Sequence, residues 1–89
     1  MKTIYKYEIK AELNKIELPQ DSKVLTVQTM DDKPFIWVLQ NTDKPKVTRY
    51  FFPYGTGHDV KLPLKEYIGT FQILKWGFVF HLFEVETDI

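Results

Sequence analysis

The residues best suited to chemistry lie in the segment Gly55-Thr56-Gly57-His58. Two glycines separated by one residue can turn backbone N–H groups inward and form a nest that binds a phosphate or carboxylate. Thr56 would add a hydroxyl, and His58 a switchable hydrogen-bond donor. Because neither a P-loop nor a dinucleotide-binding fingerprint continues from here, the favoured alternative is a long turn with glycine at two positions of positive φ.

A second possible polar cluster combines His81 with Glu84, at the end of the run from Gly77 to Glu84. An enzyme could use His58 or His81 as a general base together with Glu84. The favoured interpretation is a partly buried His81 bonded to a neighbour, because nothing nearby in sequence completes a catalytic set. A metal site would need both histidines to converge with a carboxylate such as Glu84 or Asp59, so we predict no metal site.

Arg49 is the third candidate, and hydrophobic residues flank it on its predicted strand. Its guanidinium could bind the anionic group of a ligand, as part of the same site as Gly55–His58. It could instead pair with a carboxylate across the sheet, and Glu84 is one candidate. We favour the structural pair.

Five aromatic residues form a different kind of candidate surface: Trp37, Tyr50, Phe52, Tyr54 and Trp76. The stretches Phe35–Leu39 and Gly77–Phe83 are apolar on both faces, which one small sheet cannot hide. The excess either lies in the core of a sandwich or forms an interface, where tyrosine and tryptophan are favoured anchors. Both alternatives remain open at this point.

Stretches in which side chains alternate between two faces, separated by turn residues, must position these side chains. Six longer stretches favour strands, at Thr3–Ile9, Lys23–Thr29, Phe35–Gln40, Val47–Phe52, Ile68–Leu74 and Gly77–Glu84. Ile16–Leu18 also alternates, and short helical turns could form at Ala11–Lys15 or Leu62–Tyr67. A tight hairpin at 75–77 should place Gly77 at positive φ. We predict a single all-β domain over residues 1–89, a mostly antiparallel sandwich or partly open barrel of about six strands with at most one short helical turn.

Composition narrows the classes of function. Twelve basic and twelve acidic residues among 89 give a formal net charge of zero, which makes nucleic-acid binding unlikely and a homo-oligomer possible. The absence of cysteine excludes disulfides, thiolate zinc sites and cysteine nucleophiles. No stretch resembles a signal peptide or a membrane span. We expect a soluble intracellular protein with no membrane partner and no cofactor.

A resemblance extends over nearly the whole chain. It rests on six segments in order: Ile4-Tyr5-Lys6-Tyr7, Ile16-Glu17-Leu18-Pro19, Ile36-Trp37, Tyr54-Gly55-Thr56-Gly57-His58, Tyr67-Ile68-Gly69-Thr70-Phe71-Gln72 and Phe78-Val79-Phe80-His81-Leu82-Phe83-Glu84. This order and spacing resembles a family of short bacteriophage and prophage proteins for which we know no established catalytic residues. The resemblance implies an accessory product made in the cytoplasm of an infected bacterial host.

The leading hypothesis is therefore a non-enzymatic accessory protein that binds a host protein, for example a defence or CRISPR component or an enzyme redirected during infection. It rests on the aromatic excess and the lack of a catalytic set. A second hypothesis is capture of a small ligand or nucleotide phosphate by the Gly55–His58 loop. An enzyme based on the histidines is a weaker third, and a minor virion or assembly component is a fourth.

Overall fold

Seven β-strands make up the fold of the computed structural model, which describes residues 1–87. They are β1 (Lys2–Glu8), β2 (Asn14–Pro19), β3 (Lys23–Met30), β4 (Lys33–Asn41), β5 (Lys46–Gly55), β6 (Leu64–Ile73) and β7 (Phe78–Val85). The all-β prediction is confirmed, with one strand more than the expected six. Neither of the two places where a helical turn could form contains one: residues 11–12 form bends before β2, and residues 64–67 already belong to β6.

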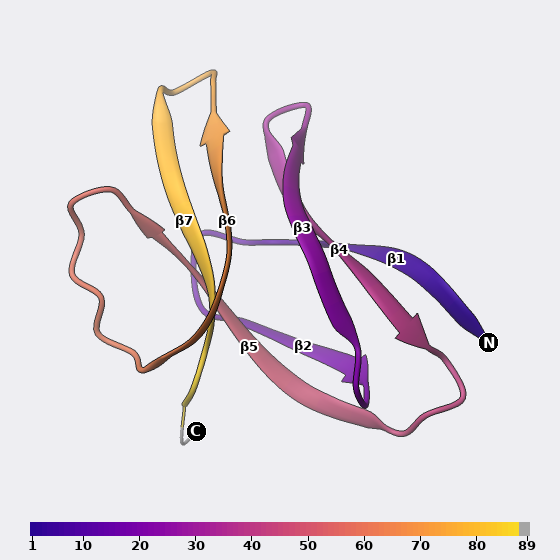
Figure 1. The fold of residues 1–89 in the computed structure, drawn as a ribbon. Coiled ribbons are helices and arrows are strands. Elements are labelled where there is room, and N and C mark those ends of the chain that lie inside the picture. The colour runs from indigo at the N-terminus through magenta and orange to yellow at the C-terminus, as the bar shows by residue number, and fades with distance from the viewer. Residues whose placement is uncertain (88–89) are drawn as a thin grey trace.

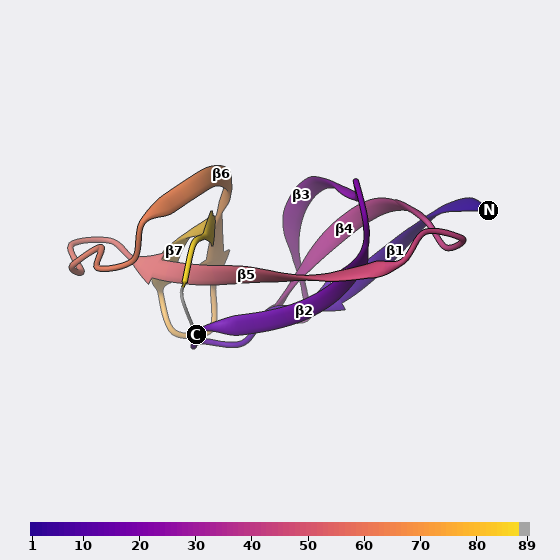
Figure 2. The same cartoon turned by 90° about the horizontal axis from the view of Figure 1, so that it is seen from below.

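The strands form two antiparallel sheets, ordered β1-β4-β3 and β2-β5-β7-β6 (Figure 1). We call them the first and the second sheet. The long strand β5 links the two halves of the molecule. Figure 2 shows β1, β3 and β4 beside its N-terminal half, and β6 and β7 at its C-terminal half. The arrangement is that of a small β-sandwich, as predicted.

The turns between strands follow local chemistry. Asp31 and Asp32 join β3 to β4 with φ of 51° and 61°, and aspartate tolerates this left-handed region better than most residues. Gly77 has a φ of 69° in the turn between β6 and β7, which confirms the predicted role of this glycine.

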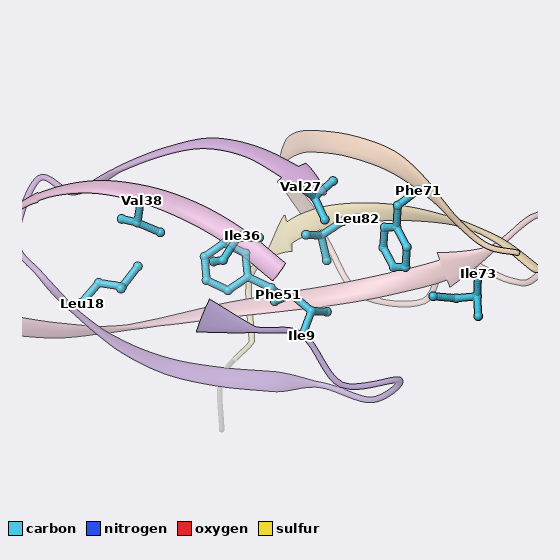
Figure 3. Packing of buried hydrophobic residues seen from close by; sticks show 9 residues of the cluster. All are labelled: Ile9, Leu18, Val27, Ile36, Val38, Phe51, Phe71, Ile73 and Leu82. Carbon is cyan, nitrogen blue, oxygen red and sulfur yellow. The ribbon is translucent and has the colours of Figure 1, made fainter. Parts of the chain in front are cut away.

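The core lies between the two sheets. Its largest fully buried side chains are Phe51, Leu18, Ile36, Leu82 and Val38 (Figure 3). Burying one such side chain is worth about 1.5–3 kcal/mol. Alternation on β4 explains part of the pattern: Ile36, Val38 and Gln40 face inward, and Gln40 accepts a 2.8 Å hydrogen bond from the Tyr7 hydroxyl.

Gly69 allows β6 to lie close to β3 of the other sheet. A Cβ atom built on Gly69 would stand 2.8 Å from Cγ1 of Val27, which is closer than two carbon atoms can pack. Val27 is buried and β-branched, so its side chain has little freedom to move aside. Glycine is therefore required here by space rather than by φ.

We expect Gly69→Ala to lower the free energy of unfolding by about 1–3 kcal/mol, the usual cost of overpacking. Urea denaturation would measure it. In a Val27→Ala background the same substitution should cost much less, because the colliding methyl group is gone. An equal cost in both backgrounds would show that the Val27 contact is not the cause.

Candidate functional site

Arg49 and Glu84 form an internal ion pair on the core-facing side of the second sheet. Arg49 donates from Nε to Glu84 Oε2 at 2.8 Å and from Nη2 to Glu84 Oε1 at 2.7 Å. Its Nη1 donates to the backbone oxygen of Ser22 at 2.6 Å. The hydrogen bond and charge of Glu84, with a smaller contribution from Glu66, outweigh burial and raise the pKa of Arg49. The favoured prediction of a structural pair is confirmed.

This pair separates Arg49 and Glu84 from the histidines. Arg49 precedes Gly55 by six residues on β5, which is about 20 Å of extended chain. Glu84 and His81 are three residues apart on β7, so their side chains project from opposite faces. The predicted His81–Glu84 cluster is therefore wrong, and Arg49 does not join the Gly55–His58 loop in one site.

His81 lies at the centre of a chain of hydroxyl groups. Its Nε2 is 2.7 Å from Oγ1 of Thr56, and its Nδ1 is 3.0 Å from Oγ1 of Thr70. Thr70 Oγ1 is in turn 2.6 Å from the hydroxyl of Tyr67. The prediction of a partly buried histidine bonded to its neighbours is confirmed. Thr70 and Tyr67 were not among the predicted site residues.

The Gly55–His58 loop is a turn, as the favoured alternative predicted, and its amides bond within the protein instead of forming an anion nest. The amide of Thr56 donates to the carbonyl of Val79 at 3.3 Å, and the amide of His58 to that of Gly55 at 3.0 Å. Gly57 has the expected positive φ, at 86°, whereas Gly55 does not. A Cβ on Gly55 would stand 2.7 Å from Nδ1 and Cε1 of the His58 ring, so a larger residue there would displace this exposed ring.

The loop, β6 and β7 border an open pocket of about 350 Å³, here called the loop pocket. Both His58 and His81 line this pocket. The other lining residues are Tyr54, Gly55, Thr56, Gly57, Val60, Tyr67, Thr70 and Phe83. The rings of Tyr54 and Tyr67 flank Phe83, with centroids 6.2 and 5.3 Å from its own. Hydroxyl, imidazole and aromatic groups thus meet in one place.

The five predicted interface aromatics do not share one surface. Tyr54 is buried, and its hydroxyl accepts a 3.3 Å hydrogen bond from the Leu62 amide, so of the two open alternatives the interface is wrong for Tyr54. Tyr50 and Phe52 are partly buried beside it on β5. Trp37 is partly buried on β4, with Lys6 Nζ 5.9 Å from its ring centroid. Only Trp76 of the five is largely exposed.

Trp76 borders a second hollow, here called the hairpin groove, beside the turn between β6 and β7. Trp76 is 63% exposed and Phe78 53% exposed. The groove measures about 200 Å³ and is lined by Ile9, Lys10, Ala11, Asp32, Pro34, Pro53, Phe71, Ile73, Trp76, Phe78 and Phe80. Asp32 Oδ1 accepts a 3.0 Å hydrogen bond from the Leu74 amide, which ties the β3–β4 turn to this hairpin.

Neither the loop pocket nor the hairpin groove has a set of side chains that could hold a metal ion, among the residues that the structure describes. Within residues 1–87, no three histidine, cysteine, aspartate or glutamate side chains are grouped so that they could hold a metal ion. The same part of the chain contains no helix that could span a membrane.

Comparison with known proteins places the chain in one family. No curated protein and no solved structure matches it. One family model does match, that of a domain of unknown function, DUF7352, and the match covers residues 1–89. The chain therefore belongs to the DUF7352 family.

Proposed function

We propose that this protein acts without catalysis, by binding another protein through the hairpin groove. The observation that carries the proposal is a continuous series of aromatic rings from the surface to the core. The ring centroids of Trp76 and Phe78 are 6.1 Å apart, those of Phe78 and Phe80 6.1 Å, and those of Phe80 and Phe71 5.4 Å.

Such an arrangement suits a docking site for physical reasons. Exposing large aromatic side chains to water is unfavourable, and a partner that covers them gains the free energy of removing them from water. Tryptophan in particular is enriched among the few residues that carry most of the binding energy of an interface. Here the inner rings are packed against the core cluster, so the exposed ones are held in place before a partner arrives.

The groove also defines the chemistry of the partner. Its walls are mainly apolar, and Asp32 and Lys10 are its charged lining residues. An apolar side chain from the partner would fill the hollow between Pro34 and Phe78. A polar rim next to an apolar centre is the common anatomy of protein interfaces.

The resemblance to phage and prophage proteins extends the proposal to a biological role. The partner would be a protein of the bacterial host, met in the cytoplasm during infection, and binding would serve host takeover or evasion of a defence system such as CRISPR. A role in the virion would use the same groove on a phage structural protein. The identity of the captured partner distinguishes these two roles.

Affinity capture from infected host cells tests the proposal with two matched pairs of substitutions. Trp76→Ser with Phe78→Ser removes the exposed rings of the groove. Ile4→Ser with Tyr5→Ser removes similarly exposed side chains, at 56% and 51%, from the edge strand β1. We expect the groove variant to bind its partner at least about tenfold more weakly, because losing a central anchor costs about 2 kcal/mol or more.

The control variant should capture the same partner as the unmodified protein. Equal capture by the groove variant, or loss confined to the β1 variant, would refute the hairpin groove as the binding surface. If ultracentrifugation shows self-association that only the groove variant abolishes, the partner is a second copy of this chain instead of a host protein.

A further inference from the structure

We propose that the loop pocket is a binding site for a neutral saccharide, and that it holds a single hexopyranose ring. The loop pocket and the hairpin groove have no lining residue in common, so this inference stands apart from the proposed protein docking. It rests on the charge, hydrogen-bonding character and aromatic content of the pocket, and each points to the same class of ligand.

The charge of the lining argues against an ionic ligand. None of the ten lining residues is Asp, Glu, Lys or Arg. The amides of Thr56 and His58, which a phosphate would need, already donate within the protein. Phosphate recognition in proteins usually combines free backbone amides with a fixed cation. A nucleotide or sugar phosphate therefore finds no counter-charge here apart from the imidazoles.

The polar groups are all of the kind that can both donate and accept hydrogen bonds. The hydroxyls of Thr56, Thr70 and Tyr67 can rotate, and the His81 imidazole can adopt either tautomer. They are already linked as a chain through His81. A sugar hydroxyl has the same double character, so it can add a hydrogen bond at Thr56, at one end of the chain, or at Thr70 within it, in whichever direction the chain is polarised.

The aromatic lining supplies the second half of sugar recognition. Tyr67 is 54% exposed, and its ring is supported by Phe83, which is partly buried. The face of an aromatic ring carries partial negative charge, and the C–H groups on one side of a pyranose ring carry partial positive charge. The sugar would lie against Tyr67 with its hydroxyls directed to Thr70 and Thr56.

The size of the pocket fits one ring. Sites for small molecules usually measure about 300–1,000 Å³, and the loop pocket, at about 350 Å³, lies at the lower end of that range. The pocket is open on one side, so the remainder of an oligosaccharide could extend into solvent. We therefore expect weak, millimolar affinity for a monosaccharide.

Titration of the ¹⁵N-labelled protein with D-glucose, D-galactose, D-mannose and N-acetylglucosamine tests the inference directly. At least one of these should shift the backbone amide signals of Thr56, Thr70 and His81 in a saturable way, and leave those of the hairpin groove unchanged. Tyr67→Ala should weaken binding at least tenfold because it removes the stacking face. Thr70→Val, which keeps the shape and removes the hydroxyl, should weaken it by a smaller factor.

Trp76→Ser serves as the control, because it removes the main anchor of the hairpin groove and should leave sugar binding unchanged. Failure of all four sugars to shift these amides would overturn the saccharide inference and leave the docking proposal intact. Tighter binding of glucose 6-phosphate or AMP than of glucose would also overturn it, and would indicate an anion site formed by the two imidazoles.

Discussion

Arg49→Ala should lower the free energy of unfolding by about 3–5 kcal/mol, the usual cost of removing one partner from a buried ion pair. Glu84 is almost fully buried on the core side of β7. Both of its oxygens accept from Arg49, so the substitution would strand a carboxylate in an apolar environment. The Ser22 carbonyl would lose its bond from Arg49 at the same time.

A double substitution separates the cost of the stranded charge from the value of the pair itself. Arg49→Met combined with Glu84→Met replaces both ions by apolar side chains of similar length, and such replacements are often neutral or stabilising. We expect urea denaturation to show most of the stability restored. If Arg49→Ala alone cost less than about 1 kcal/mol, the pair would behave like a surface salt bridge and the prediction would fail.

The pH dependence of this effect follows from the raised pKa of Arg49. A base whose pKa is raised on folding contributes stability that is complete below its unfolded-state pKa and is lost only as the pH rises through the folded-state pKa. For arginine both values lie in the strongly alkaline range. The protonation of Arg49 therefore adds no slope to the stability curve at neutral pH, and chemical denaturation at several pH values around neutrality would reveal any such slope.

The fold was largely predictable, because apolar and polar residues alternate along many of the strands and turn residues separate one strand from the next. The misjudged segment is informative. Residues 11–15 were compatible with a helical turn, but the Asn14 side chain holds them in another conformation. It accepts from the amide of Lys10 and donates to the carbonyls of Lys10 and Glu12, and these bonds replace those that a helix would make.

The site was predictable only in part, and the missed residues had different causes. A hairpin with its turn at 74–77 pairs Thr70 with His81, so counting back from that turn could have identified Thr70. Tyr67 could not be found in this way, because the register shifts between Tyr67 and Gly69. Alternation already places His81 and Glu84 on opposite faces of their strand, and the structure gives each of them separate partners.

The second large effect is expected at Phe51, the largest of the fully buried side chains. Phe51→Ala should lower the free energy of unfolding by about 3–5 kcal/mol, through lost burial and the cavity left behind. A domain of 89 residues has a total stability of about 4–13 kcal/mol at the usual value per residue. The substitution therefore removes a large share of it, and urea denaturation would measure the loss.

Two controls define what the loss would mean. Phe51→Leu keeps most of the apolar volume and should cost clearly less than alanine. Tyr5→Ala removes a ring that is half exposed at the edge of the first sheet, and should change stability by no more than about 1 kcal/mol. Equal losses from Phe51→Ala and Tyr5→Ala would contradict the central position of Phe51.

The position of Phe51 also predicts how the two sheets unfold. The ring lies on β5 in the same core cluster as Ile36 of the first sheet and Leu82 of the second (Figure 3). The two sheets should therefore unfold together.

The two tryptophans can test this. Trp37 lies on β4 of the first sheet and Trp76 in the β6–β7 hairpin of the second. The single-tryptophan variants Trp76→Phe and Trp37→Phe therefore follow the two sheets separately. After correction for the stability change of each substitution, both fluorescence transitions should coincide with the loss of circular dichroism, because one shared core unfolds as a unit. Two separate midpoints would show that the sheets unfold independently and that Phe51 does not couple them.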